Sequence, residues 1–232
     1  MKIGIITAMT TERRQIERLL PEPLQYKYGP FVFTTGTIGV NEIILMQCGI
    51  GKVNAASGTT ELIHHFAPDC IISTGVAGGI DNSLQIMDVV VSKQIVHHDV
   101  WCGDGNEIGQ VQGLPTYFDG NPTLLECALN LSTTTKIHGG LICSGDQFIT
   151  AGDQLAKIKK QFPDGLAVDM ESASIAQTCH LYQVPFISFR IISDTPGSEN
   201  NWEQYTNFWD TIADRSFKVT EAFLLSIPQT IK

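Results

Sequence analysis

The feature that most constrains the fold is a series of short, continuous apolar runs that alternate with helical patterns. The runs that predict strands cover residues 2–8, 31–35, 42–47, 70–73, 88–96, 138–143, 166–170 and 185–193. Helices are expected over 10–20, 53–66, 124–131, 154–161, 171–182 and 202–225. Strands that are buried on two faces read as unbroken apolar runs. The sequence therefore predicts an α/β fold whose central, mixed, twisted β-sheet is flanked by helices.

The chain length and the loop pattern favour a single domain. A chain of 232 residues with 43% hydrophobic residues can bury a substantial core. No stretch rich in Pro, Gly or Ser resembles a linker, so residues 1–232 are expected to form one domain. Residues 101–121 are Gly-rich and predict a long loop, which in a compact domain is usually functional or mobile. Residues 194–201 predict a second, polar loop.

Charge and cysteine usage limit the partners and the compartment. The net charge of −9 disfavours binding to nucleic acid, because an acidic surface repels the phosphate backbone. No apolar run is long enough to cross a membrane. The cysteines form no C-x-x-C pair and mostly lie in apolar runs, which indicates reduced thiols and a cytoplasmic protein. They are Cys48, Cys70, Cys102, Cys127, Cys143 and Cys179.

Polar residues gather at the ends of the predicted strands, where α/β folds place their binding sites. Glu12 follows the first strand, Glu171 follows the strand at 166–170, and Asp194 follows the strand at 185–193. Each acid also has a simpler interpretation, since a carboxylate in the first turn of a helix stabilises the helix dipole and Ser-Asp is common in turns. Arg190 lies inside an apolar strand and is therefore expected to need a carboxylate or a ligand.

Two glycine-rich segments and a histidine pair are weaker signals. The segments 49–51 and 75–79 look like strand-to-helix turns, but they match neither the dinucleotide fingerprint nor the P-loop. Tight backbone packing is the better interpretation of each. His97, His98 and Asp99 could be metal ligands, but adjacent histidines in a strand point to opposite faces, so no metal site is expected.

Six motifs in register carry more information than any one of them. They are Gly4-Ile5-Ile6-x-Ala8-Met9-x-x-Glu12, Gly49-Ile50-Gly51-Lys52-Val53, Thr74-Gly75-Val76-Ala77-Gly78-Gly79, Ser144-Gly145-Asp146-x-Phe148-Ile149, Val168-Asp169-Met170-Glu171 and Arg190-x-x-Ser193-Asp194. Together they resemble the methylthioadenosine/S-adenosylhomocysteine nucleosidases over nearly the whole chain. The resemblance implies a nucleoside phosphorylase-like fold and hydrolysis of these adenine thio-nucleosides without a cofactor or a metal.

The resemblance also implies catalytic roles that agree with the chemistry. Cleavage of the N9–C1′ bond builds positive charge on the ribose and negative charge on the adenine. Asp194 would protonate or hydrogen-bond N7 of the adenine, with its pKa raised by burial and its carboxyl oriented by Ser193. Glu12 would activate the attacking water, and Arg190 would organise the site.

The remaining positions are implied to bind the substrate. Glu171 would accept hydrogen bonds from the ribose hydroxyls, and Met170 would pack under the sugar. Phe148 would stack on the adenine, and the backbone of Ile149 would read the purine edge.

The 5′-thio group would lie in an apolar pocket formed by Met9, Ile50 and Tyr205. Two positions depart from the family pattern, because Asp169 replaces a frequent Glu and Val76 a frequent Ser. On that ground Asp169 is left out of the expected catalytic set.

Three other functions stay open from the sequence. A phosphate-dependent phosphorylase is one, although the arginine and serine that would hold phosphate fall where this chain has Ser73 and Val76. Water is therefore the expected nucleophile, since an anion beside Glu12 would be poorly held. A nucleosidase that acts mainly on aminodeoxyfutalosine and a non-catalytic nucleoside-binding protein are the others.

The resemblance further implies a homodimer. Trp101, Pro115, Tyr117 and Phe118 lie in the long loop and could be interface aromatics and their neighbours, or they could pack onto their own subunit. The sequence gives no preference between these interpretations.

Overall fold

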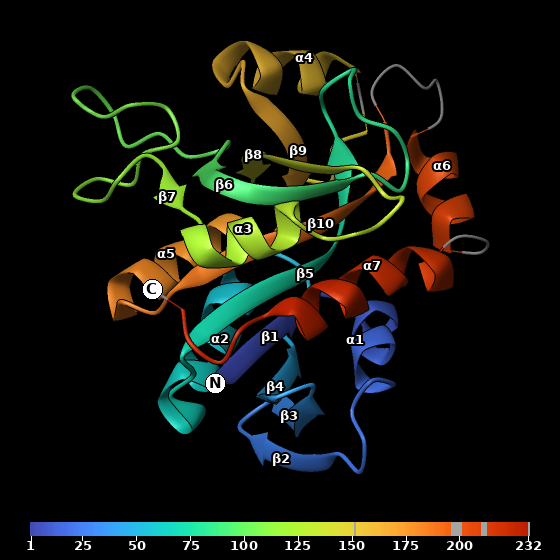
Figure 1. Ribbon diagram of the computed structural model, residues 1–232. Coiled ribbons are helices and arrows are strands. Elements are labelled where there is room, and N and C mark those ends of the chain that lie inside the picture. Colours follow the sequence, from blue (N-terminus) through green and yellow to red (C-terminus); the bar gives the residue numbers. More distant parts are fainter. Residues whose placement is uncertain (151, 196–200, 210–212, 232) are drawn as a thin grey trace.

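The structure is a computed structural model that describes residues 1–150, 152–195, 201–209 and 213–231 (Figure 1). The strands are β1 (Lys2–Thr7), β2 (Leu24–Tyr28), β3 (Phe31–Ile38), β4 (Asn41–Gln47), β5 (Cys70–Gly79), β6 (Val89–His97), β7 (Phe118–Asp119), β8 (Ile137–Ser144), β9 (Gly165–Asp169) and β10 (Phe186–Asp194). The helices are α1 (Thr10–Glu17), α2 (Lys52–Phe66), α3 (Pro122–Leu129), α4 (Gly152–Gln161), α5 (Ser172–Tyr182), α6 (Asn201–Asn207) and α7 (Ala213–Ser226). The predicted alternation of strands and helices is confirmed.

The strands of the described residues belong to one mixed sheet that closes on itself. The order β10-β6-β8-β9-β5-β1-β4-β3-β2 is completed by a second pairing between β10 and β5. Five strands, β5, β10, β6, β8 and β9, therefore form a closed barrel, and β1, β4, β3 and β2 extend it from β5. The pairings β10–β5, β6–β8 and β8–β9 are parallel, whereas β10–β6 and β5–β9 are antiparallel. The predicted mixed sheet is confirmed.

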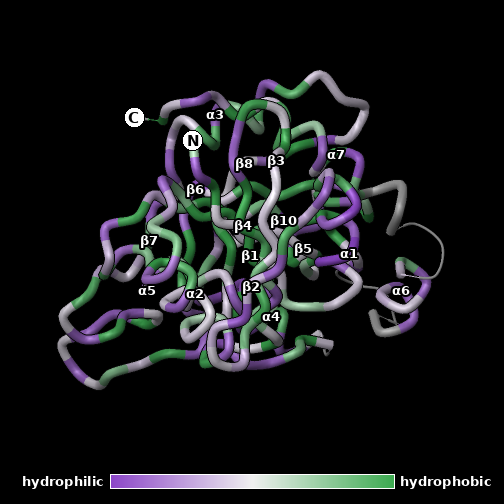
Figure 2. Tube along the Cα trace, turned by 90° about the horizontal axis from the view of Figure 1, so that it is seen from below, coloured by the Kyte–Doolittle hydropathy of each residue, from purple (hydrophilic) through white to green (hydrophobic). Residues whose placement is uncertain are grey.

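Helices cover two faces of this sheet, and the described core residues form three clusters, two of which take alternate residues of β1. On one face Ile3 and Ile5 pack with residues of α1, α3 and α7, including Ile16 and Phe223. On the other face Ile6 packs with residues of α2 and α5. Figure 2 shows the hydrophobic colouring along these central strands and more hydrophilic stretches in the peripheral segments. Burial on two faces explains why the strands are continuous apolar runs.

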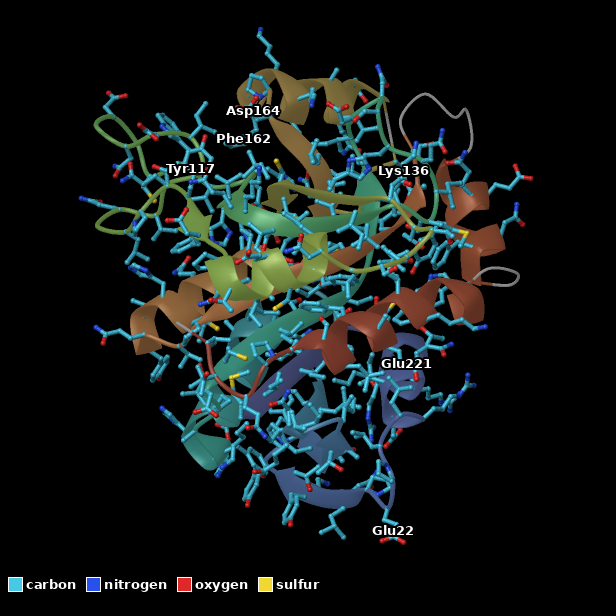
Figure 3. The ribbon with its side chains drawn as sticks, in the orientation of Figure 1. Glu22, Tyr117, Lys136, Phe162, Asp164 and Glu221 are labelled. Atoms are coloured by element: carbon cyan, nitrogen blue, oxygen red, sulfur yellow. The ribbon has the colours of Figure 1, made fainter. Side chains whose placement is uncertain are left out.

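The structure adds two strands that the sequence did not predict, β2 and the short β7. β2 lies at the edge of the sheet and pairs only with β3, so it lacks the apolar run of a buried strand. Glu22, in the turn before β2, has a φ of +48° and points outward at the end of the molecule (Figure 3). The expected loop at 101–121 is largely irregular and contains only the short strand β7.

Two predicted boundaries were wrong. The segment 75–79 is not a strand-to-helix turn, because β5 runs on through Gly79 and pairs there with β9 and β10. The single helix expected over 202–225 is two helices, α6 and α7. Phe208, just after α6, is fully buried in the same core cluster as Phe217 and Phe223 of α7. The apolar residues that predicted one long helix therefore come from both helical segments. Residues 196–200 of the predicted polar loop and 210–212 of the predicted helix lie outside the described residues.

Candidate active site

A pocket opens at the carboxyl ends of β1, β5, β9 and β10. This is the edge at which α/β sheets bind their ligands. The described residues that line it are Ala8, Met9, Glu12, Ile50, Val76, Ala77, Gly78, Gln147, Phe148, Ile149, Val168, Asp169, Met170, Glu171, Ser193, Asp194 and Tyr205. Ten of the eleven sequence-predicted site residues are among them; Arg190 lies behind the lining.

Glu12 is buried in the first turn of α1 and is held by backbone donors. Its Oε2 accepts hydrogen bonds of 3.0 Å from the N–H groups of Ala8 and Met9, and its Oε1 accepts one of 3.1 Å from Val76 N–H. The bond from Met9 belongs to the capping box of α1, so Glu12 stabilises the start of this helix. Burial raises the pKa of Glu12, and the Arg190 charge and the three N–H groups oppose that rise.

The position of Glu12 explains the glycine at 75. A Cβ at Gly75 would collide with the Glu12 carboxylate and come within 2.8 Å of the Arg190 guanidinium. The close approach of these two side chains therefore requires a residue without a side chain in β5.

Arg190 is fully buried in β10 and is surrounded by oxygen acceptors. Its Nε lies 2.8 Å from Asp169 Oδ2, and one terminal nitrogen donates to Ser73 Oγ at 2.7 Å and to Ser172 Oγ at 3.1 Å. Ser172 also donates to Asp169. The same terminal nitrogen lies 4.0 Å from Glu171 Oε2. The carboxylate partner predicted for Arg190 is thus Asp169.

The contacts of Asp169 at this site were not predicted from the sequence. Asp169 lines the pocket and pairs with Arg190, and Ser73 and Ser172 complete the environment of the guanidinium. The only available signal was its place at the end of a buried strand beside Met170. No sequence pattern marked Ser73 or Ser172, because their bonds to Arg190 join β5 and α5 to β10, which are distant in sequence.

Glu171 precedes α5 as its N-cap and faces the pocket. Its Oε1 accepts a 2.9 Å hydrogen bond from Gly51 N–H, at the start of α2. Burial raises the pKa of Glu171 to about 7 against the opposing charge of Arg190, and the nearby Asp169 carboxylate adds to the rise. Glu171 can therefore change its protonation near neutral pH.

Asp194 ends β10 and is oriented by its neighbour. The Ser193 hydroxyl donates to Asp194 Oδ1 at 2.7 Å, with the carbonyl oxygen of Ala77 also nearby at 3.3 Å. Burial raises the pKa of Asp194, and the bond from Ser193 opposes the rise. A carboxyl group with a raised pKa can hold a proton to donate.

Apolar and aromatic side chains form the rest of the pocket. Phe148 and Tyr205 meet edge to face with ring centroids 5.4 Å apart, and the Tyr205 hydroxyl lies 3.4 Å from Met9 Sδ. Ile149 is buried, whereas Ile50 stands half exposed at the mouth. Such a lining suits the flat faces of a purine and an apolar substituent.

Two members of the candidate metal motif, His97 and Asp99, have structural partners. His97 hydrogen-bonds Gln177 at 2.9 Å, and Asp99 pairs with Lys52 at 2.8 Å. Among the residues that the structure describes, no group of three or more His, Cys, Asp or Glu is arranged to hold a metal. The described helices include none that is long and apolar enough to span a bilayer.

The fold and the site define a member of the phosphorylase superfamily, whose sequence profile matches residues 2–225. A 5′-methylthioadenosine/S-adenosylhomocysteine nucleosidase of Desulfotalea psychrophila is 41% identical over 94% of this chain and 95% of its own length. The chain belongs to the family of these nucleosidases.

Solved structures agree with this assignment. A nucleosidase of the same name from Colwellia psychrerythraea, in complex with adenine, superposes with a TM-score of 0.93 at 34% identity and covers 100% of this chain and 98% of that chain. The enzyme from Neisseria meningitidis, in complex with methylthio-immucillin-A, gives 0.91 at 35% identity and covers 97% and 99%. The predicted fold and family are confirmed.

Proposed function

We propose that this chain hydrolyses the N-glycosidic bond of 5′-methylthioadenosine and S-adenosylhomocysteine with water as the nucleophile. The observation that carries the proposal is the pocket shared by three buried carboxyl groups, Glu12, Glu171 and Asp194, each with a raised pKa. The names of the relatives and the ligands in their structures support this substrate class.

Asp194 acts as the acid at the leaving group. Burial raises its pKa and so favours the protonated form that an acid needs, and Ser193 holds its carboxyl in one orientation. As the C1′–N9 bond breaks, the electron pair moves into the purine and N7 takes the Asp194 proton. Neutral adenine then leaves in place of an anion.

Glu12 takes the proton of the attacking water. Three N–H donors and the Arg190 charge favour its ionised form against the effect of burial, so it can act as a base. The water oxygen bonds to C1′ while its proton passes to the Glu12 carboxylate. The negative charges of Glu12 and Glu171 also stabilise the cationic ribose of the transition state.

Glu171 and the apolar lining bind the substrate. Gly51 N–H donates to Glu171 Oε1, so Glu171 Oε2 accepts the hydrogen bonds of the ribose hydroxyls. Met170 packs under the sugar, Phe148 stacks on the adenine, and the backbone of Ile149 reads the purine edge. Met9, Ile50 and Tyr205 enclose the 5′ substituent.

The phosphorylase alternative is disfavoured by the charge of the pocket. No Arg, Lys or His is found among its described lining residues. Arg190 is committed to Asp169 and two serines behind the lining, so it is not free to hold an anion. Bound phosphate would face buried carboxylates without a cationic partner.

We also propose a homodimer in the cytoplasm. Trp101 and Tyr117 expose 65% and 37% of their surfaces, and both lie on the long loop. These aromatics suit an interface, whereas Phe118 is buried in its own subunit and does not. The six cysteines are all free, as expected of a reducing compartment.

The test is adenine release from methylthioadenosine, with and without phosphate, by the wild type and Asp194→Asn. The amide has no carboxyl proton to donate, so kcat should fall by about 10²–10⁴-fold, the usual contribution of a general acid. The matched control is Asp119→Asn, an exposed aspartate that accepts a bond from Gln94, and it should keep wild-type activity. Phosphate-dependent turnover with ribose-1-phosphate as a product would overturn the hydrolase.

A further inference from the structure

Three segments meet at the start of α2 in a closed set of hydrogen bonds outside the pocket. The N–H of Lys52 donates to Asp146 Oδ1 at 2.7 Å, and its ammonium donates to Asp99 Oδ1 at 2.8 Å. The N–H of Asp146 donates to Asp99 Oδ2 at 2.9 Å. Each member thus contacts the other two. The three side chains follow β4, β6 and β8, so the set joins elements that are distant in sequence.

The helix start depends on these contacts, because α2 has no capping side chain of its own. Its N-cap is Gly51, with a φ of +93° that favours glycine. A Cβ there would lie 3.0 Å from Asp146 Oδ1. The first N–H groups of the helix are therefore satisfied by carboxylates from elsewhere, Gly51 by Glu171 and Lys52 by Asp146.

The Asp99–Lys52 pair is more shielded from solvent than an ordinary surface pair. The side chains are only 19% and 22% exposed. Burial alone would raise the pKa of Asp99, but the bonds from Lys52 and from the N–H of Asp146 outweigh it, and the pKa lies below its ordinary value. Asp99 therefore stays ionised through the neutral range, and the set persists under assay conditions.

The set connects two walls of the pocket. The segment before α2 carries Ile50 and the Gly51 N–H that holds Glu171, to which the proposed function assigns the ribose and 5′ side. The segment after β8 carries Phe148 and Ile149, to which it assigns the purine side. Asp146 lies two residues before Phe148 and bonds to the residue after Gly51.

We propose that Asp146, Asp99 and Lys52 are positioning residues that fix the separation of the ribose-side and purine-side walls. None of them lines the pocket. The three residues therefore act through the side chains that line the pocket, and they determine the affinity for a ligand that contacts both walls. The proposal rests on the proposed function for the identity of that ligand, an adenine nucleoside.

The test compares Asp146→Ala and Asp146→Asn in the full chain, with methylthioadenosine as the substrate. Loss of the acceptor should raise KM about tenfold, equivalent to about 1.4 kcal/mol, with kcat within about threefold, because ground and transition states lose the same binding. The asparagine oxygen still accepts the Lys52 N–H, so Asp146→Asn should restore a KM near that of the wild type. Asp81→Ala, which breaks the Lys159 pair away from the pocket, is the control and should leave KM unchanged.

A second readout separates this proposal from the proposed function. Amide hydrogen exchange at Lys52 and through 145–149 should be faster in Asp146→Ala and close to wild type in Asp146→Asn. This measurement needs no turnover, so it tests the contact even if the wild type releases no adenine. An unchanged KM together with unchanged exchange in Asp146→Ala overturns the proposal. Equal KM values for the Ala and Asn variants, both raised, also overturn it.

Discussion

Replacement of Arg190 by Met should destabilise the protein more than any surface substitution. Arg190 and Asp169 have side chains only 1% and 2% exposed, and the guanidinium also lies near Glu171 and Glu12. The variant keeps the apolar length of the side chain but leaves these carboxylates without their cation. Removal of one partner from a buried ion pair costs about 3–5 kcal/mol.

The loss translates into a large and pH-dependent shift of Tm. In a domain of this size, 1 kcal/mol changes Tm by about 2–4 °C, so Arg190→Met should lower Tm by roughly 6–20 °C at pH 7.5. Without the guanidinium, which opposes the rise at Glu12 and Glu171, the pKa values of these two carboxyl groups rise further above those of the unfolded chain. Protonation then neutralises them in the folded state, so the deficit should shrink as the pH falls toward 5.5.

Thermal unfolding at these two pH values is the assay, with Arg14→Met as the matched control. Arg14 is exposed on α1, and its replacement should change stability by no more than about 0.5 kcal/mol. A fall in Tm of less than 2 °C, or a deficit that grows on acidification, would refute the reasoning about the buried charge cluster.

Three further predictions concern single groups in the pocket. The pKa of Glu171 rises from its ordinary 4.5 in the unfolded chain to about 7 on folding, so its ionisation removes stability as the pH rises across this range. Glu171→Gln should flatten the fall of Tm over that pH range. If Tm falls with rising pH as steeply as in the wild type, the fall does not come from the ionisation of Glu171. Ser193→Ala removes the hydrogen bond that lowers the pKa of Asp194, so the alkaline limb of kcat/KM against pH should move to higher pH; a limb that stays in place would exclude Ser193 from this role. Gly75→Ala introduces a Cβ into the Glu12 carboxylate and should cost about 1–3 kcal/mol of stability with reduced kcat, measured by melts and adenine release. Wild-type values for Gly75→Ala would show that β5 can yield at this point.

The sequence predicted the elements that depend on local patterns. A strand buried on two faces is an apolar run wherever it lies, so β1, β4, β6, β8 and β10 were predicted close to their observed positions. The six motifs and the rule that binding sites lie at strand ends predicted which residues would lie close together. In the structure all of them except Arg190 line one pocket. Their individual roles remain predictions.

Local patterns failed where solvent or side chains distant in sequence, rather than the buried face of the sheet, set the residue type. β2 is an edge strand with mostly exposed residues, so no apolar run marks it. The glycines of β5 were interpreted as a turn, because glycine-rich segments usually are turns. Gly75 instead lies within a strand, where the side chains of Glu12 and Arg190 leave no room for a Cβ.

The tertiary structure alone decided which side chains meet across the barrel. The closure of β10 onto β5 brings Ser73 to Arg190, and the packing of α5 brings Ser172 to the same guanidinium. The bond between Lys52 and Asp146 joins positions 94 residues apart. Such contacts leave no periodic trace in the sequence, since a hydrogen bond depends on distances set by the whole sheet and not on the spacing of its partners along the chain.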